Sequence, residues 1–183
     1  MKAFKQTLIA VVFIGTIFSG VMFAHASAES VKLTDEHLQQ IKTNCVSVKA
    51  KLSRLHSNDA LARVNVGQIY ESISTKLMSG FNGRVANNNM NNISLSSVSS
   101  QYDNQLNTFR SDYITYENQL SRALGVNCSN NPQEFYDAVV SARIKRAKVY
   151  EDVTRLNQFI DQYTKEVDKF EAEYKLATQE VTQ

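Results

Sequence analysis

The 183-residue chain has very few of the residues that interrupt helices, with one proline, Pro132, and six glycines. It also lacks tryptophan, and its only cysteines are Cys45 and Cys128. Because proline and glycine are the strongest local breakers of regular structure, their scarcity leaves room for long helices. A single pair of cysteines leaves three interpretations open: a disulfide, half of a metal site, or two unrelated small hydrophobic residues.

Motifs that mark enzymes are missing as well. The sequence contains no G-x-S-x-G, H-E-x-x-H, G-x-x-x-x-G-K or EF-hand pattern. Past residue 28 the histidines are His37 and His56. On one continuous helix they would lie roughly 28 Å apart, too far to share a metal or a proton relay. We therefore predict no catalytic residue, no metal and no cofactor, and the chain is predicted not to be an enzyme.

The N-terminus has the organisation of a secretory signal peptide. M-K-A-F-K is a basic start, residues 8–24 are almost entirely apolar, and H-A-S-A-E supplies small residues for cleavage. We predict cleavage after Ala28, with Ala26 as the alternative, which gives a signal peptide over residues 1–28 and a single domain over residues 29–183. The protein is thus predicted to be secreted or periplasmic, with no membrane span after cleavage. An uncleaved N-terminal anchor is the other interpretation, since ~17 apolar residues reach the lower limit for a span.

Loss of the signal peptide removes the excess of positive charge. The whole chain has 20 Lys and Arg against 18 Asp and Glu, but Lys2 and Lys5 both lie in residues 1–28, where there is no acidic residue. The remaining chain therefore has 18 residues of each sign. A balanced charge does not favour nucleic acid or an anionic membrane surface as a partner, and neither is predicted.

Heptad-like spacing of apolar residues predicts three long helices, over about 34–79, 96–124 and 132–180. An asparagine-rich segment, residues 80–95, is predicted to be a loop at the tip between the first two. The fold is predicted to be all-α: an elongated antiparallel three-helix bundle with coiled-coil-like heptad packing and one disulfide. The three seams consist of Leu38, Ile41, Cys45, Val48, Leu52, Leu55, Asp59, Ala62, Val66, Ile69 and Ile73; of Tyr102, Leu106, Phe109, Tyr113, Tyr116, Leu120 and Ala123; and of Phe135, Val139, Ala142, Arg146, Val149, Val153, Leu156, Ile160, Tyr163, Val167, Phe170, Tyr174, Ala177 and Val181.

The distance of the two cysteines from the tip favours the disulfide. Cys45 lies 35 residues before Gly80, the first residue of the turn, and Cys128 lies 33 residues after Leu95, where the next helix begins. At ~1.5 Å per residue both cysteines are about 50 Å from the tip, and hence at the same level. A metal site would need more ligands, and only His37 is near. In an exported protein such a pair is most simply a bridge.

Two charged residues interrupt the apolar seams, Asp59 in the first helix and Arg146 in the third. Counted from the cysteine level they lie opposite each other, and Tyr116 of the second helix reaches the same level. We predict a buried polar layer of Asp59, Tyr116 and Arg146 that fixes the helix register. Two alternatives stay open: an active-site acid with an arginine partner, and an Asp59 that caps a restarted helix and faces water.

The other charged and aromatic residues are assigned structural positions. The acid pairs Glu151–Asp152 and Glu171/Glu173 lie between seam positions beside lysines and arginines, which predicts solvated flanks. Five of the eight tyrosines fall on the seams, which predicts packing in the core rather than stacking of sugars or bases; they are Tyr102, Tyr113, Tyr116, Tyr163 and Tyr174.

Two apolar regions are candidate contact surfaces. The tip segment carries apolar residues among its asparagines, and the third helix is expected to outrun the hairpin near residue 168 while its seam continues. An apolar seam without a partner favours association. Either the tip folds over the extended helix, or the extension pairs with a second molecule or a partner protein. The candidate contact residues are Phe81, Val85, Met90, Ile93, Phe170 and Tyr174.

Two segments carry a family resemblance. They are R-V-N-V-G-Q-I-Y-E-S-I-S-T-K-L-M, which begins at Arg63, and Y-E-D-V-T-R-L-N-Q-F-I-D-Q-Y, which begins at Tyr150. Both are similar to segments of uncharacterised secreted helical (coiled-coil) proteins of small-genome bacteria, and the resemblance spans most of the chain past the signal peptide. It implies a bacterial source, a cleaved signal peptide and the cysteine pair, and it implies no activity.

These features predict a noncatalytic exported helical-bundle protein that acts by protein–protein interaction or self-assembly at the cell envelope. The partner is an unknown protein or a second copy of the chain. The alternative is a periplasmic chaperone or adaptor that grips client proteins at the tip, through Phe81 and Met90. A second alternative is an enzyme of unrecognised type, although a heptad core leaves little room for a pocket of titratable groups.

Overall fold

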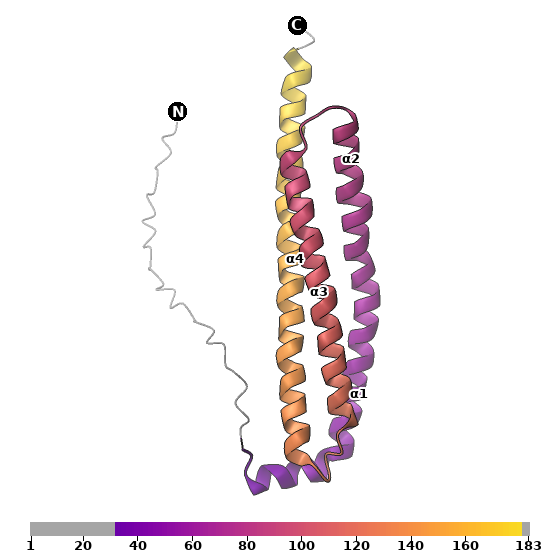
Figure 1. Ribbon diagram of the computed structural model, residues 1–183, viewed down its shortest axis with the longest axis vertical. Coiled ribbons are helices and arrows are strands. Elements are labelled where there is room, and N and C mark those ends of the chain that lie inside the picture. The colour runs from indigo at the N-terminus through magenta and orange to yellow at the C-terminus, as the bar shows by residue number, and fades with distance from the viewer. Residues whose placement is uncertain (1–31, 181–183) are drawn as a thin grey trace, which may run out of the picture.

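The fold is an all-α bundle of three helical rods that run side by side, as the computed structural model shows for residues 32–180 (Figure 1). The first rod is continuous from α1 through a π-helical segment to α2, α3 returns antiparallel to it, and α4 runs parallel to it. The predicted signal peptide and Val181 lie outside the described residues. The elements are α1 (Asp35–Ser72), η1 (Ile73–Met78), α2 (Ser79–Asn87), α3 (Ile93–Gly125) and α4 (Pro132–Glu180).

Local sequence determines where the helices begin. The Thr34 side chain accepts a hydrogen bond from the His37 amide at 3.4 Å, and acidic residues in the first turn of α1 complement the positive end of the helix. In the turn before α4, the Asn127 side chain accepts hydrogen bonds from two following amides, both at 3.1 Å. α4 then begins at Pro132, whose fixed backbone suits the first helical position.

A disulfide joins Cys45 of α1 to Cys128 in the turn between α3 and α4, which confirms the bridge predicted from helix lengths. The two residues are 83 positions apart, and their Cα atoms are separated by 5.5 Å. Both are buried, in a cluster that includes Val126, Phe135 and Ala138. Closing a loop of this length contributes roughly 4 kcal/mol to stability in the loop-entropy description. The bridge ties the lower end of the first rod, where α1 lies across the bundle in Figure 1, to the other two.

The connection at the tip is shorter than predicted. The expected loop over residues 80–95 is wrong for most of its length, because the first rod continues to Asn87 and α3 begins at Ile93. Burial supplies the reason. Val85 is almost fully buried in the core, and packing of an apolar face outweighs the low helix propensity of glycine and asparagine. The turn itself contains Asn89 with a positive φ of 54°, a conformation that asparagine adopts more readily than most residues.

Segment η1 keeps one side of the first rod facing the core over residues 70–82. Tyr70, Ser74, Met78 and Asn82 are all buried, at a strict spacing of four residues. In a regular α-helix, with 3.6 residues per turn, positions spaced by four rotate steadily around the axis. The wider turn of η1, with a hydrogen bond from the Ser79 amide to the Ser74 carbonyl, keeps the four residues on one side.

The predicted seam of the first helix is also out of phase in its middle, because an α-helix turns once every 3.6 residues and drifts away from a heptad pattern of 3.5. Val66 and Ile69 were expected in the core, but they are 40% and 57% exposed, whereas Gly67 and Tyr70 are buried. α3 and α4 pack closely along their length, and α1 packs less extensively on either of them. This difference leaves apolar side chains of α1 at the surface, beside α4.

The seam tyrosines link the three rods. Four of the five are buried, as predicted, and only Tyr174 is half-exposed. The Tyr102 hydroxyl donates to the Tyr70 carbonyl at 3.1 Å, and the Tyr163 hydroxyl donates to the Asn82 side chain at 2.7 Å. Because burial raises the pKa of Tyr163 to about 12, its phenol stays protonated and keeps this role as a donor. These bonds hold the segment around η1 against α3 and α4.

Candidate functional site

The structure brings Asp59, Tyr116 and Arg146 together, one residue from each rod. Oδ2 of Asp59 in α1 accepts hydrogen bonds from the Tyr116 hydroxyl of α3 at 2.6 Å and from Nε of Arg146 in α4 at 2.7 Å. Nη2 of Arg146 donates to Oδ1 of Asp59 at 3.1 Å. The arginine and the carboxylate therefore form a two-pronged pair, which fixes their relative orientation as well as their distance.

Hydrogen bonding sets the protonation of this cluster. Burial acts to raise the pKa of Asp59, but the hydrogen bonds from Arg146 and Tyr116 outweigh it and hold the pKa below its ordinary value of 3.8. Burial and the bond to Asp59 raise the pKa of Tyr116, and the bond to Asp59 raises that of Arg146. At neutral pH the cluster is a carboxylate, a neutral phenol and a guanidinium, so none of its members titrates near the pH at which general acid–base catalysis works best.

The cluster is not sealed inside the bundle, which corrects the prediction of a fully buried layer. The Asp59 side chain is 17% exposed, but the Arg146 side chain is 52% exposed. The physical reason is that α1 packs less extensively on α4 than α3 does, so the guanidinium reaches the carboxylate from the surface. The interpretation of Asp59 as the cap of a restarted helix is also wrong, because α1 runs unbroken through this position.

A groove with a volume of about 290 Å³ opens beside the cluster, and we call it the α1–α4 groove. Its α1 wall runs from Asp59 to Val66, and its α4 wall runs from Arg146 to Val153. Aromatic rings of α3 form the floor, and most of the lining is apolar. The charged members of the lining are Asp59, Arg63 and Arg146.

Aromatic rings, rather than an acid, hold Arg63 in the α1–α4 groove. Its guanidinium carbon lies 5.3 Å from the ring centre of Phe109 and 5.6 Å from that of Tyr113, within the range of cation–π attraction. The guanidinium also lies against Gly67, where an added β-carbon would overlap it. Within residues 32–180, no carboxylate forms an ion pair with Arg63. Helix counting gave no signal for this residue, because Arg63 lies off the predicted seam.

Most of the predicted contact surface is packed inside the tip. Val85 is buried, and Phe81, Met90 and Phe170 pack against the same core cluster. The rings of Phe81 and Phe170 meet edge to face, with centres 5.7 Å apart. Of the two alternatives, the tip thus folds over α4, although the end of α4 continues past it (Figure 1). The two members that stay exposed are Ile93 and Tyr174.

Asp152, between α3 and α4, is a buried carboxylate that the sequence pattern misplaced. It was expected on a solvated flank, but it is fully buried. Its Oδ1 accepts from the Gln105 amide at 2.9 Å and lies 3.4 Å from Nζ of Lys148. No donor in the described part of the chain reaches Oδ2. Burial, together with the nearby Asp112 carboxyl, raises the pKa of Asp152.

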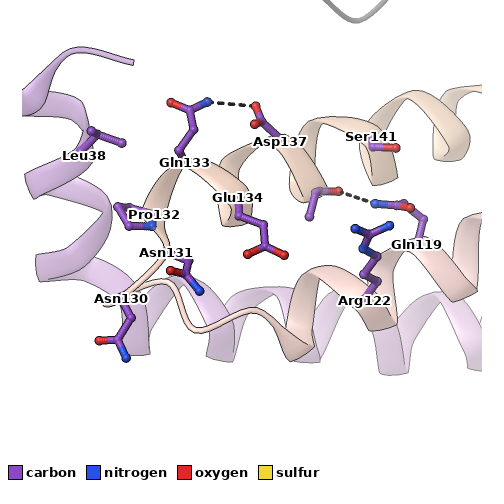
Figure 2. A pocket seen from close by; sticks show the side chains of 11 residues that line it. Leu38, Gln119, Arg122, Asn130, Asn131, Pro132, Gln133, Glu134, Asp137 and Ser141 are labelled. Carbon is purple, nitrogen blue, oxygen red and sulfur yellow. Dashed lines mark hydrogen bonds between the residues drawn. The ribbon is translucent and has the colours of Figure 1, made fainter. Parts of the chain in front are cut away.

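A second hollow, of about 800 Å³, lies at the disulfide end of the bundle (Figure 2). Side chains from the end of α3 and the start of α4 line it, and several of them bond within the fold. Gln119 donates to the Ala138 carbonyl at 3.2 Å, and Gln133 donates to Asp137 at 3.0 Å. Because these polar groups already bond to neighbours, we assign this hollow no function.

The described residues also limit the kinds of site that the fold offers. Residues 32–180 contain no group of three or more His, Cys, Asp or Glu side chains placed to hold a metal ion. No helix in that range is both long and apolar enough to cross a membrane. Comparison with known proteins finds no protein family, no curated protein and no solved structure that matches the chain. We therefore base the proposed function on the α1–α4 groove.

Proposed function

We propose that the protein is a noncatalytic exported protein that binds another protein at the cell envelope through the α1–α4 groove. The observation that carries the proposal is the exposure of large apolar side chains along the groove, with Val66 on the α1 rim, Tyr150 on the α4 rim, and Ile69 one turn of α1 beyond Val66. Apolar surface gathered in one place, with charges at its edge, is typical of sites that contact another protein.

Export is proposed from the disulfide and the signal sequence together. A bridge between Cys45 and Cys128 persists in oxidising compartments outside the cytoplasm and is rare inside it. The basic start, apolar run and small residues of the N-terminus point the same way. A bacterial envelope as the location rests on the family resemblance alone.

Two other functions have less support from the geometry. A chaperone that grips clients at the tip needs exposed apolar residues there, and Phe81 and Met90 pack against the core instead. An enzyme needs a group that can take or give a proton or attack a substrate. The Asp59 carboxylate is instead fully engaged by Arg146 and Tyr116. Binding is the function that uses the exposed rims.

Photo-crosslinking from the groove rim tests the proposal against a matched control. Ile69 and Ile114 are both isoleucines and both 57% exposed. Ile69 lies one turn of α1 beyond the lining residue Val66, whereas Ile114 on α3 has no lining residue three or four positions away. A benzophenone amino acid at position 69 of the exported protein, in the cells that make it, is expected to give one discrete adduct with a second protein. The same amino acid at position 114 is expected to give none.

Three results would contradict this function. If the protein forms an adduct only with itself, its function is self-assembly and not the binding of another protein. A broad distribution of adduct masses would favour a client-binding chaperone. The absence of any adduct at position 69 would remove the groove as a binding site.

A further inference from the structure

The α1–α4 groove has the length and direction of a site for one more helix. Its α1 wall runs from Asp59 to Val66 and its α4 wall from Arg146 to Val153, about two turns each, or roughly 11 Å at ~1.5 Å per residue. α1 and α4 run parallel, with α3 antiparallel to both (Figure 1). A helix laid in the groove would contact both walls and complete a four-helix arrangement with coiled-coil-like packing.

A small molecule fits this groove less well than a helix does. Its volume of about 290 Å³ lies at the lower limit for ligand pockets, which span roughly 300–1,000 Å³. Apolar surface also continues beyond the lining, since Ile69, one turn of α1 past Val66, is exposed but does not line the groove. Tyr150 lines the groove on the α4 side and is still 73% exposed. A helix covers the rims as well as the floor, whereas a small ligand would leave the rims in water.

One charge of the groove has no counter-charge. Asp59 is matched by Arg146 and Tyr116, but Arg63 is bounded by aromatic rings and by Gly67. A guanidinium carries five N–H donors, and contact with ring faces leaves them without acceptors. Its best partner is a carboxylate, which accepts two of these donors at once.

We propose, on the basis of the proposed function, that the groove binds an amphipathic helix of a partner protein whose acidic side chain pairs with Arg63. The apolar face of that helix lies on the aromatic floor and between the exposed rims. A basic side chain at the same position would meet the like charge of Arg63, so the groove also selects against basic helices.

A displayed library of amphipathic helices tests the pairing on the exported protein. Each member keeps an apolar face at positions i, i+3, i+4 and i+7, and the flanking positions are randomised. Helices selected on the wild type are expected to carry Asp or Glu at one flanking position. Replacing that acid by its amide is expected to weaken binding about tenfold, as for the loss of one charge-assisted hydrogen bond.

Variants of the protein test whether Arg63 causes the preference for an acidic residue. In Arg63→Gln, the acidic helix and its amide copy are expected to bind equally, whereas Arg155→Gln, at an exposed α4 position that does not line the groove, should keep the tenfold difference. Gly67→Ala tests the same pairing in case the Arg63→Gln protein fails to fold. It retains the arginine but displaces the guanidinium, and it is expected to reduce the preference while leaving binding of the amide copy unchanged.

Three outcomes would overturn the proposal. If the selected helices show no preference for an acidic residue, the proposed pairing with Arg63 is wrong. Cross-linking at Ile69 still tests partner binding separately. If Val66→Glu abolishes the binding of none of the selected helices, the groove is not a helix site. Saturable binding of decanoate that depends on Arg63, with no helix selected, would assign the groove to an acidic amphiphile.

Discussion

α4 faces two neighbours, and two interhelical aspartates, one in each contact, have pKa values shifted in opposite directions. In the α1–α4 groove, Asp59 accepts hydrogen bonds from an arginine and a tyrosine, and its pKa is lowered. In the seam between α3 and α4, Asp152 is fully buried beside Asp112, and its pKa is raised. The donors around each carboxylate, together with its depth, decide the sign of the shift. The α3–α4 contact is thus a closely packed seam that stabilises the bundle, whereas the α1–α4 contact leaves a groove open to solvent.

The largest expected difference between seam and groove is the cost of removing an apolar side chain. Leu156 is fully buried in the core, so Leu156→Ala is expected to lower the free energy of unfolding by about 3 kcal/mol. Val66 lies on the open rim, and Val66→Ala is expected to change it by less than ~0.5 kcal/mol. Urea unfolding measures both. A cost for Val66→Ala as large as that for Leu156→Ala would mean that the groove is closed in solution.

A smaller effect is expected from the arginine of the groove. Arg146→Ala leaves the Asp59 carboxylate with Tyr116 as its remaining hydrogen-bond donor, and we expect a loss of about 1–2 kcal/mol in the free energy of unfolding. The half-exposed position of Arg146 keeps the loss below that of a fully buried pair. Arg143→Ala, at an exposed position one turn earlier, is the control and should cost less than ~0.5 kcal/mol. Equal losses for the two variants would reduce the Asp59 pair to an ordinary surface salt bridge.

The two aspartates should make the free energy of unfolding change with pH in two limbs, one in which it falls as the pH is lowered and one in which it falls as the pH is raised. The folded-state pKa of Asp59 is below 3.8, so its contribution is present above 3.8 and is lost as the pH falls through the folded pKa. The folded-state pKa of Asp152 is above 3.8, so its contribution is complete below 3.8 and is lost as the pH rises through the folded pKa.

Substitution by the neutral amide separates these limbs. Asp152→Asn is expected to flatten the loss of stability as the pH rises above 3.8, and Asp59→Asn is expected to flatten the loss below it. The free energy of unfolding, measured by urea across the acid range, reads both. A wild-type profile that Asp152→Asn leaves unchanged would contradict the raised pKa of the buried Asp152 carboxyl between α3 and α4.

Distances along the helices were predictable from the sequence. Every α-helix rises by the same amount per residue, so counting from the tip placed Cys45 level with Cys128, and counting from the cysteines placed Asp59 level with Arg146. The tip itself was misplaced unequally, since the first rod extends eight residues past Ser79 and α3 begins two residues before Leu95. The disulfide was nevertheless predicted, although the predicted tip loop was too long.

The phase of the first rod and the burial of Asp152 were not predictable in this way. Nothing in the residues of η1, Ile73–Met78, marks a π turn, yet that turn keeps Ser74, Met78 and Asn82 on the side of the rod that faces the core. Burial of Asp152 depends on Gln105, which lies on another helix and supplies its hydrogen bond. Both features arise from packing between helices, whereas a heptad pattern reports one helix at a time.

Hydroxyl-radical footprinting of two tyrosines of α4 tests most directly the claim that the α1–α4 groove is covered by a partner. Tyr150 lies on the groove rim, and Tyr174 lies on the end of α4 beyond the tip; both are exposed. We predict that Tyr150 is oxidised several-fold less in the native envelope than in the purified protein, and that Tyr174 is oxidised equally in both. Equal oxidation of Tyr150 in the two states, or protection of Tyr174 alone, would contradict the claim.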